Sequence, residues 1–192
     1  KENDSAVYLS GNGPLVAVLN EALAINDHKQ CLVKNINKKM SDSRREVSED
    51  DFYKNLHELR SKFGGRAILR AIHYFDENKR VKIAIEALKN EDTETFLKMV
   101  NESGQSSYRL LQNCHYDKDS KQGIALAYEL CNKYLNGGAY RVHGGGFRGT
   151  VIAFVPEKDQ IPFINKMKQV FGERQVCKLN IRMLGSSRIY ED

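Results

Sequence analysis

Residues 139–155 read AYRVHGGGFRGTVIAFV, and this stretch decides the fold. Its two ends have the period-two pattern and the β-branched and aromatic content of strands, which predicts strands over Ala139–His143 and Thr150–Val155. Between them, four of six residues are glycine. We therefore expect a glycine-rich loop that joins the two strands.

Upstream of these strands the apolar residues recur at helical spacing. Ser48 lies three residues before Asp51, a capping-box pattern that opens a helix, and Asp92 is placed to cap another. We expect the two long helices on either side of Asp92 to pack as an antiparallel hairpin. The predicted helices cover residues 50–62, 66–89, a segment that begins after Asp92, and 120–135.

Downstream, Pro156 stops the second strand, and the pattern predicts a helix over 160–171 that ends at Gly172. Closing strands are predicted over 176–181 and 188–190. The predicted fold class is α+β, with an antiparallel four-stranded sheet covered by helices on one face. The first 46 residues, which include an apolar stretch over 15–23, are left without an assignment.

The composition limits the classes of protein to which this chain can belong. Of 192 residues, 41% are hydrophobic and 29% charged, as in ordinary globular proteins. No apolar run is as long as a membrane span, and the N-terminus lacks a secretory pattern, so we expect a cytoplasmic protein without a membrane partner. The four cysteines form no CxxC or Cys/His cluster, which argues against a zinc site and a disulfide framework. The net charge of +5 lies mainly in residues 137–192 and suits an anionic ligand or a solvated surface.

The candidate chemistry lies in the loop between the two central strands. A wide glycine-rich turn exposes backbone N–H groups that can face a phosphate, because no Cβ atom obstructs the approach. The same glycines would serve a plain hairpin, where they only permit positive φ. The spacing is not that of a P-loop. The candidate residues are Gly144, Gly145, Gly146, Phe147 and Gly149, with Arg148 as a further possibility.

Residues 138–150 resemble the third motif of the galactokinase family, within the GHMP small-molecule kinases. Upstream segments are similar, in order and spacing, to the C-terminal helices of galactokinases. These segments are Arg70–His73, Glu77–Val81, Ala84–Leu88, Asn101–Ser103 and Ser106–Ser107. The resemblance divides the chain into a galactokinase-like C-terminal domain over 47–192 and a segment 1–46 that would belong to the region between the lobes.

The resemblance implies the C-terminal lobe of a two-lobed kinase, with a GHMP C-terminal sheet of ferredoxin-like type. The N-terminal lobe of galactokinases carries the sugar-recognition signature, the serine-rich phosphate loop and the catalytic residues, and none of these motifs is present here. We therefore expect no catalytic residue in this chain, no tightly bound cofactor and no activity of the chain alone. In the full-length enzyme, ATP and Mg²⁺ would serve the phosphorylation of galactose at its anomeric hydroxyl.

The resemblance also implies a role for the loop, which would lie against the phosphate loop of the missing N-terminal lobe and help to close the site. Arg148 stands where the family usually has a small residue, and it either reaches a phosphate or points to solvent. We expect structural roles for His73 and His143, and we expect Glu77 to pair with Arg80 on one helix face.

Two other functions are open at this stage. A non-catalytic regulator or sugar sensor derived from a galactokinase would use the same lobe. An RNA-binding module is the remote alternative, because residues 148–155 superficially resemble the signature strand of RNA-recognition motifs. Such sheets need aromatic side chains for base stacking, but Thr150 and Ile152 stand at those positions, so nucleic acid is not the expected partner.

Overall fold

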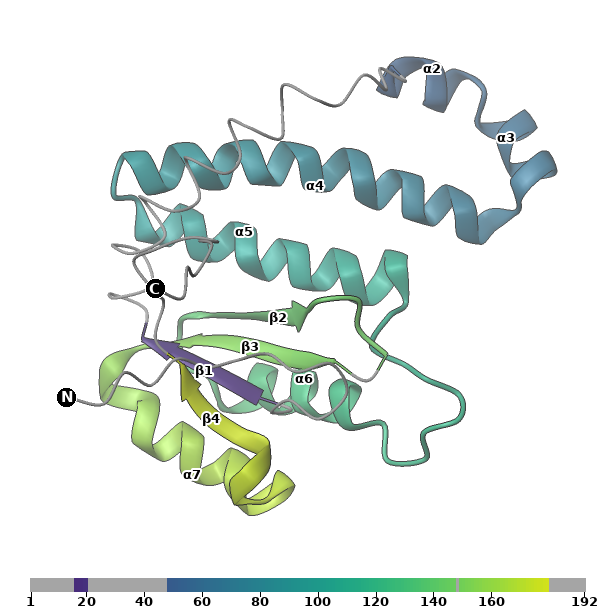
Figure 1. Cartoon of the computed structure of the whole chain (residues 1–192). Coiled ribbons are helices and arrows are strands. Elements are labelled where there is room, and N and C mark those ends of the chain that lie inside the picture. The colour runs from purple at the N-terminus through teal and green to yellow at the C-terminus, as the bar shows by residue number, and fades with distance from the viewer. Residues whose placement is uncertain (1–15, 21–47, 148, 180–192) are drawn as a thin grey trace, which may run out of the picture.

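The computed structural model of the chain describes residues 16–20, 48–147 and 149–179, which form a four-stranded sheet between two layers of helices (Figure 1). Helices α4 (Gly65–Lys89) and α5 (Thr93–Ser106) lie side by side over one face of the sheet. Helices α6 (Gly123–Tyr134) and α7 (Gln160–Phe171) cover the other face. None of the described helices is both long enough and apolar enough to cross a membrane.

The segment after Ser48 forms two short helices, α2 (Glu49–Lys54) and α3 (Leu56–Phe63), where the sequence predicts one. The cap itself is confirmed, because the Ser48 hydroxyl accepts a hydrogen bond from the backbone N–H of Asp51 at 3.4 Å. The break lies at Asn55, whose side-chain amide donates to the Asp51 carbonyl at 2.8 Å. Asparagine side chains compete with the backbone in this way, and so they interrupt helices.

The predicted helical hairpin is confirmed by α4 and α5. The Asp92 carboxylate accepts a hydrogen bond from the Thr95 N–H at 3.0 Å and caps α5. A single π-helical turn, η1 (Ser107–Leu111), continues α5 and ends at Gln112, which has a φ of 53°. Helix α6 begins three residues later than the sequence predicts, because Gln122 has a φ of 44° and its amide donates to the Tyr116 carbonyl.

The sheet has the strand order β2-β3-β1-β4. Strands β2 (Ala139–His143) and β3 (Thr150–Val155) form the predicted antiparallel pair, with His143 opposite Thr150. Strand β1 (Val16–Asn20) lies between β3 and β4 (Val176–Leu179) and is parallel to both.

The prediction of four antiparallel strands is therefore wrong, since the antiparallel part comprises two strands. The chain leaves β3, passes through α7 and returns in β4, and a crossover of this kind makes the strands that it joins parallel. Val16–Asn20, within the apolar stretch that has no assignment from the sequence, supplies the strand between them. The strand predicted over 188–190 and the end of the one predicted over 176–181 lie outside the described residues.

The expectation that helices cover one face of the sheet is also wrong, because each face has its own apolar core. Along β3, Val151 and Ala153 pack in the cluster with α6 and α7, whereas Ile152 and Phe154 contact the cluster with α4 and α5. Successive side chains of a strand point to opposite faces, so β3 contributes to both cores. With both faces covered in the described part of the chain, no sheet surface is open for the base stacking that the RNA-binding alternative requires.

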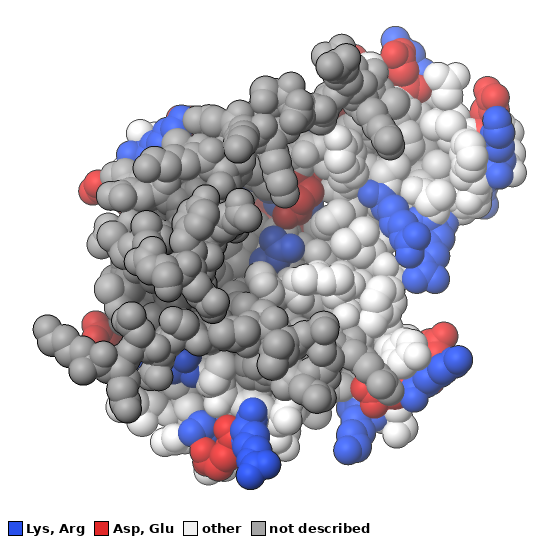
Figure 2. All heavy atoms as spheres, in the orientation of Figure 1, with Lys and Arg blue, Asp and Glu red and all other residues white. Residues whose placement is uncertain are grey.

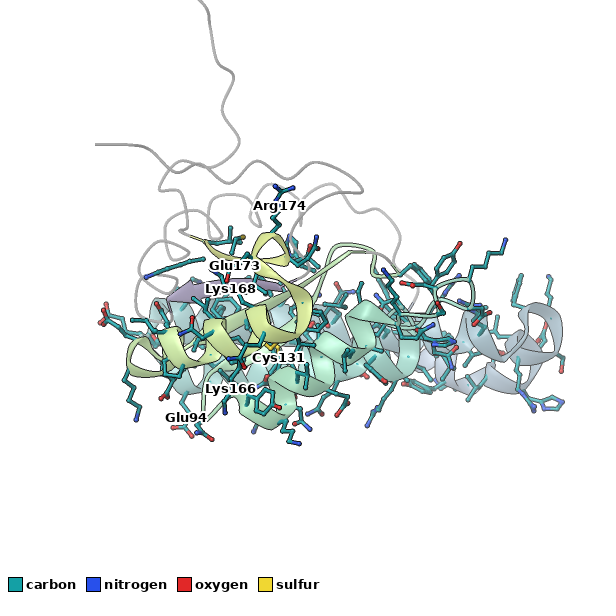
Figure 3. All side chains as sticks on the ribbon, turned by 90° about the horizontal axis from the view of Figure 1, so that it is seen from below. Glu94, Cys131, Lys166, Lys168, Glu173 and Arg174 are labelled. Carbon is teal, nitrogen blue, oxygen red and sulfur yellow. The ribbon has the colours of Figure 1, made fainter. Side chains whose placement is uncertain are left out.

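The core beneath α6 and α7 is apolar and contains free thiols. Figure 3 shows Cys131 pointing inward from α6, with Lys166 and Lys168 on α7. Burial raises the pKa of Cys131 to about 12 and that of Cys114 to about 11, so both thiols stay protonated at neutral pH. At the surface, the Lys168 ammonium lies 2.6 Å from the Glu173 carboxylate, an ion pair just past the end of α7.

Candidate functional site

The loop between β2 and β3 is held in a left-handed backbone conformation. Gly144 and Gly146 have φ values of 74° and 81°, and Phe147 has a φ of 58°. The Gly149 N–H donates to the Gly146 carbonyl at 3.0 Å and closes the turn. Glycine adopts positive φ at no steric cost, whereas a phenylalanine in that region is strained. Arg148 lies outside the described residues, so its role stays a prediction.

The second half of the loop packs against Asn113, a buried residue that follows η1. The Asn113 carbonyl accepts a hydrogen bond from the Phe147 N–H at 2.5 Å. The Asn113 side-chain amide donates to the Gly145 carbonyl at 3.4 Å. A Cβ atom placed on Gly146 would overlap the Asn113 carbonyl oxygen and crowd its side chain. Gly146 is therefore required by this chain's own packing and by its positive φ.

The first half of the loop faces open space. A Cβ atom added to Gly144 or Gly145 would meet no heavy atom within 4 Å. Gly144 still needs positive φ, but Gly145 has an ordinary φ, so nothing in the described part of the fold requires a glycine there. The backbone N–H groups of Gly145 and Gly146 have no hydrogen-bond acceptor among the residues that the structure describes. Two neighbouring free N–H groups can bind an anion.

A cleft of about 780 Å³ opens beside the loop. Its walls come from the first turn of α4, from η1 and the segment that follows it, and from Phe147 of the loop. Figure 2 shows basic side chains around the open space between the α3–α4 corner and the body of the molecule. Sequence reasoning missed this cleft, because residues 108–117 carry no motif. The lining residues are Arg66, Tyr108, Arg109, Gln112, Cys114, His115, Tyr116, Asp117 and Phe147.

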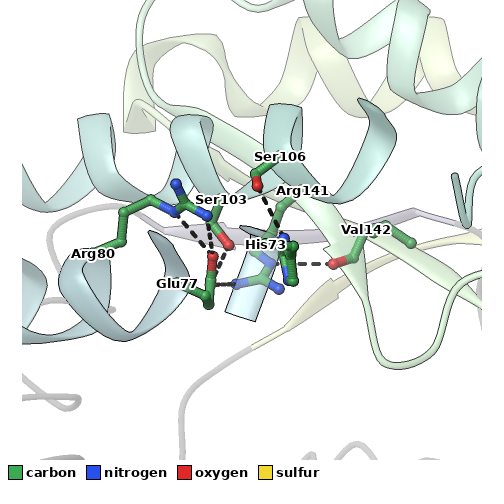
Figure 4. A network of polar contacts seen from close by, with 7 residues as sticks. All are labelled: His73, Glu77, Arg80, Ser103, Ser106, Arg141 and Val142. Carbon is green, nitrogen blue, oxygen red and sulfur yellow. Dashed lines mark hydrogen bonds and ion pairs between the residues drawn. The ribbon is translucent and has the colours of Figure 1, made fainter. Parts of the chain in front are cut away.

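A network of polar side chains ties α4 and α5 to β2 (Figure 4). The Glu77 carboxylate accepts hydrogen bonds from the Ser103 hydroxyl at 2.5 Å and from Arg80 Nε at 2.9 Å. The Arg141 guanidinium, which projects from β2, lies 3.5 Å from the same carboxylate. The predicted pairing of Glu77 with Arg80 is thus confirmed, and it extends to the strand that leads into the loop.

The network keeps Glu77 ionised. Burial raises the pKa of Glu77, but the Ser103 hydrogen bond, the Arg80 hydrogen bond and the Arg141 charge outweigh it and hold this pKa below its usual range. His73 lies nearby and shares a hydrogen bond of 2.9 Å with the Ser106 hydroxyl. Burial is the main cause that lowers the pKa of His73, which is neutral at pH 7 and has the structural role that we expect.

Asn101 of α5 binds the outer edge of β2. Its amide donates to the Gly138 carbonyl at 3.2 Å, and its side-chain oxygen accepts from the Tyr140 N–H at 3.0 Å. Helix and strand are in close contact here, since a Cβ atom on Gly104 would lie 2.7 Å from the Tyr140 carbonyl oxygen. Asn101 and Glu77, which lie in segments that resemble the family, therefore contact β2. These contacts fix the strand from which the loop begins.

His143 ends β2 and enters the loop. Burial lowers the pKa of His143, and the nearby Arg141 charge lowers it further, so the imidazole is neutral at pH 7. Among the described residues, no group of three His, Cys, Asp or Glu side chains could hold a metal ion. The loop backbone and the cleft beside it are candidate ligand contacts in this part of the chain.

Comparison with known proteins places this site in a family context. Residues 84–173 match the family model described as GHMP kinases C terminal. The galactokinase of Haemophilus influenzae is 34% identical over 123 residues, which are 64% of this chain and 30% of that protein. The galactokinase of Lacticaseibacillus casei is 31% identical over 131 residues, 67% of this chain and 31% of that protein. That of Glaesserella parasuis is 35% identical over 114 residues, 59% of this chain and 28% of that protein. The chain thus spans about 30% of the length of these relatives, and no solved structure gives a significant match.

Proposed function

We propose that this chain, a galactokinase-like C-terminal lobe of the GHMP kinase family, contributes its glycine loop to the site of an ATP-dependent sugar kinase. In the complete protein, an N-terminal lobe would supply the catalytic residues and most contacts to ATP. The substrate that the relatives' name suggests is galactose.

The observation that carries this proposal is the state of Gly145. Its φ is ordinary, its surroundings are open, and its N–H has no acceptor in the described part of the chain. A glycine that the fold does not need loses more conformational entropy on folding than any other residue would. Close approach of another backbone or of a phosphate explains why a side chain is absent at this position.

In this proposal the chain's own residues act by positioning. The N–H groups of Gly145 and Gly146 face the phosphate side of the site, and Asn113 holds the loop so that they need no rearrangement when the ligand arrives. The Glu77–Arg141 contact and Asn101 fix β2, from which the loop starts. Bound Mg²⁺ and ATP would supply the phosphoryl group and neutralise its developing charge.

The test is a coupled assay with ATP, Mg²⁺ and galactose on the full-length protein that contains this chain. Because the site requires an open backbone at Gly145, we expect Gly145→Val to raise KM for ATP or lower kcat by about tenfold, the size of one lost charge-assisted hydrogen bond. The melting temperature of the isolated lobe should not change. Gly65→Ala is the matched control, since Gly65 also has an ordinary φ and open surroundings.

Three outcomes would contradict the proposal. Normal kinetic constants for Gly145→Val would indicate that the loop is a plain hairpin without a role in the site. Turnover by the isolated chain, free of host galactokinase, would place the catalytic residues within it. A full-length wild-type protein that binds galactose without phosphorylating it would favour the regulator or sugar sensor.

A further inference from the structure

We propose that a second pocket, at the outer edge of β2, binds a small neutral polyol through amide and phenol groups of α5, α6 and β2. This inference goes beyond the proposed function, because the pocket shares no lining residue with the cleft beside the glycine loop. The two lie at different ends of β2. A strand rises about 3.4 Å per residue, so the loop that follows His143 begins roughly 10 Å beyond Tyr140 of the pocket.

The size and construction of the pocket suit one hexose-sized ring. Its volume of about 290 Å³ lies at the lower end of the range of roughly 300–1,000 Å³ that is usual for small-molecule sites. Helix α5 supplies Asn101 and Gln105, which are four residues apart and therefore on the same helix face. Helix α6 supplies Tyr128 and Asn132 with the same spacing, and β2 supplies Tyr140. The polar groups thus come from regular elements and not from a loop.

The Tyr128 hydroxyl is the group that points to a ligand. Tyr128 is only 6% exposed, yet its hydroxyl has no hydrogen-bond partner among the residues that the structure describes. The hydroxyl oxygen lies against α5, since a Cβ atom on Gly104 would be 3.1 Å from it. The rings of Tyr108 and Tyr140 pack on the Tyr128 ring, with centroids at 5.2 and 4.8 Å. Buried tyrosine hydroxyls normally have a partner, and a ligand hydroxyl in this pocket would supply it.

Two amide side chains of the pocket are also available to a ligand. The Gln105 amide makes no hydrogen bond within the described part of the chain. The Asn132 oxygen accepts from the Tyr140 hydroxyl at 3.0 Å, which leaves the Asn132 NH₂ group free. Asn101 differs, because both of its polar atoms are bound to β2. The free groups include donors and acceptors, and a hydroxyl group can pair with either kind.

The lack of charge in the lining selects the class of ligand. Besides the amides and phenols, the described lining consists of one leucine and two glycines, so none of it is charged. Burial raises the pKa of Tyr128 and that of Tyr140, and both phenols are neutral at pH 7. A phosphate or a carboxylate would find no counter-charge here, and an apolar ligand would leave the amides without partners. A neutral ring with several hydroxyl groups meets both conditions.

Hexoses and cyclitols both have this chemistry, and NMR titration of the ¹⁵N-labelled chain can separate them. The signals to follow are the side-chain amides of Gln105 and Asn132, which report on the pocket itself. The probes are D-glucose, D-mannose, D-galactose and myo-inositol, with cyclohexanol as a ring that carries a single hydroxyl. We expect at least one polyol to shift both signals in a saturable way at millimolar concentration, and cyclohexanol to leave them unchanged. The polyol that binds most tightly identifies the source.

Tyr128→Phe removes the hydroxyl and keeps the ring. We expect it to weaken the polyol about fivefold, the size of one lost neutral hydrogen bond. The melting temperature of the free chain should not fall, because the hydroxyl has no partner in the described structure to lose. Tyr134→Phe is the matched control, since it makes the same change on the same helix outside the pocket lining. It should change the affinity by less than about twofold, as is usual for a substitution away from the site.

The proposal would be overturned if none of the four polyols shifts the two amide signals even at tens of millimolar, or if cyclohexanol shifts them equally. A lower melting temperature of Tyr128→Phe would show that the hydroxyl is bonded within the chain, and equal losses of affinity in Tyr128→Phe and Tyr134→Phe would show that binding does not use the pocket. Either result would also overturn it. The titration requires no turnover and no second lobe, so its failure would leave the kinase proposal untouched, and the reverse also holds.

Discussion

Both halves of the glycine loop contain glycine, but only the second half packs against another segment of the described chain. Gly146 and Phe147 press against Asn113, where a side chain on Gly146 has no room. Gly144 and Gly145 face open space, and Gly145 does not even need positive φ. Neighbouring glycines of one motif therefore differ in what the described fold requires of them: it requires a glycine at Gly146 but not at Gly145, which our proposal assigns to the ligand site. Stability measurements and kinetic measurements can separate these reasons.

The largest effect on stability is expected from Gly146→Val. A β-branched residue at positive φ costs about 1–3 kcal/mol, and forcing a side chain into the packed Asn113 contact costs a further 1–3 kcal/mol. We therefore expect the free energy of unfolding of the isolated chain to fall by about 2–6 kcal/mol, measured by urea denaturation. Gly145→Val, the matched control, should lie within about 0.5 kcal/mol of wild type. Equal losses for the two variants would abolish the distinction between the two halves.

A smaller effect is expected from Asn113→Ala, which removes the supporting side chain and keeps the backbone. The hydrogen bond to the Gly145 carbonyl is lost, while the Asn113 carbonyl still accepts from the Phe147 N–H. We expect the free energy of unfolding to fall by about 1–2 kcal/mol. Asn132→Ala serves as control, because its hydrogen bond with the Tyr140 hydroxyl is exposed and should matter less. If Asn132→Ala proves the more damaging variant, Asn113 does not support the loop.

Gly144→Ala should cost about 1 kcal/mol, the usual penalty of a left-handed conformation for a residue with a Cβ atom. Gly64 is its natural comparison, since it has a φ of 79° and also faces open space. Gly64→Ala should lower the free energy of unfolding, measured by urea denaturation, by a similar amount. A much larger loss for Gly144→Ala would show that the open half of the loop has a packing role as well.

The smallest effect concerns pH. Because burial and Arg141 lower the pKa of His143, the folded chain takes up a proton there less readily than the unfolded chain, whose histidines titrate near pH 6.5. Stability from this residue is present above that pH and is lost as the pH falls through it. We expect the melting temperature to decline from pH 7.5 to 5.5, and less steeply in His143→Gln. The remaining slope should come from His73, whose pKa burial also lowers. An unchanged slope in His143→Gln would contradict the lowered pKa of this imidazole.

Local signals in the sequence were sufficient to predict many of the helices and strands. Strands β2 and β3 and helix α7 have the predicted bounds, because Pro156, Gly172 and the loop glycines end these elements by backbone chemistry alone. Strand β1 escaped assignment because it is a short apolar run that lies between two parallel neighbours and lacks the alternation of a half-exposed strand.

The residues of the candidate loop could be identified from the sequence, and their role in a site stays a prediction, but the contacts that support the loop could not be predicted. The loop glycines stand out in the sequence, and positive φ at Gly146 is one of the two reasons that a glycine run suggests. The hydrogen bonds with Asn113 join residues 32 and 34 positions apart, and the cleft gathers α4, η1 and the loop. No local pattern encodes such contacts, because they depend on how helices pack on the sheet.

The binding of Asn101 and Arg141 to β2 has a consequence for aggregation. Within the described sheet β2 is an edge strand, and such an edge can template the addition of a strand from another molecule. The Gly138 carbonyl and the Tyr140 N–H are occupied by Asn101, and the Val142 carbonyl accepts from Arg141 Nε. An incoming strand would have to displace these side chains before it could bond to any of those three backbone groups, so this edge resists intermolecular sheet extension even when the chain is concentrated by itself.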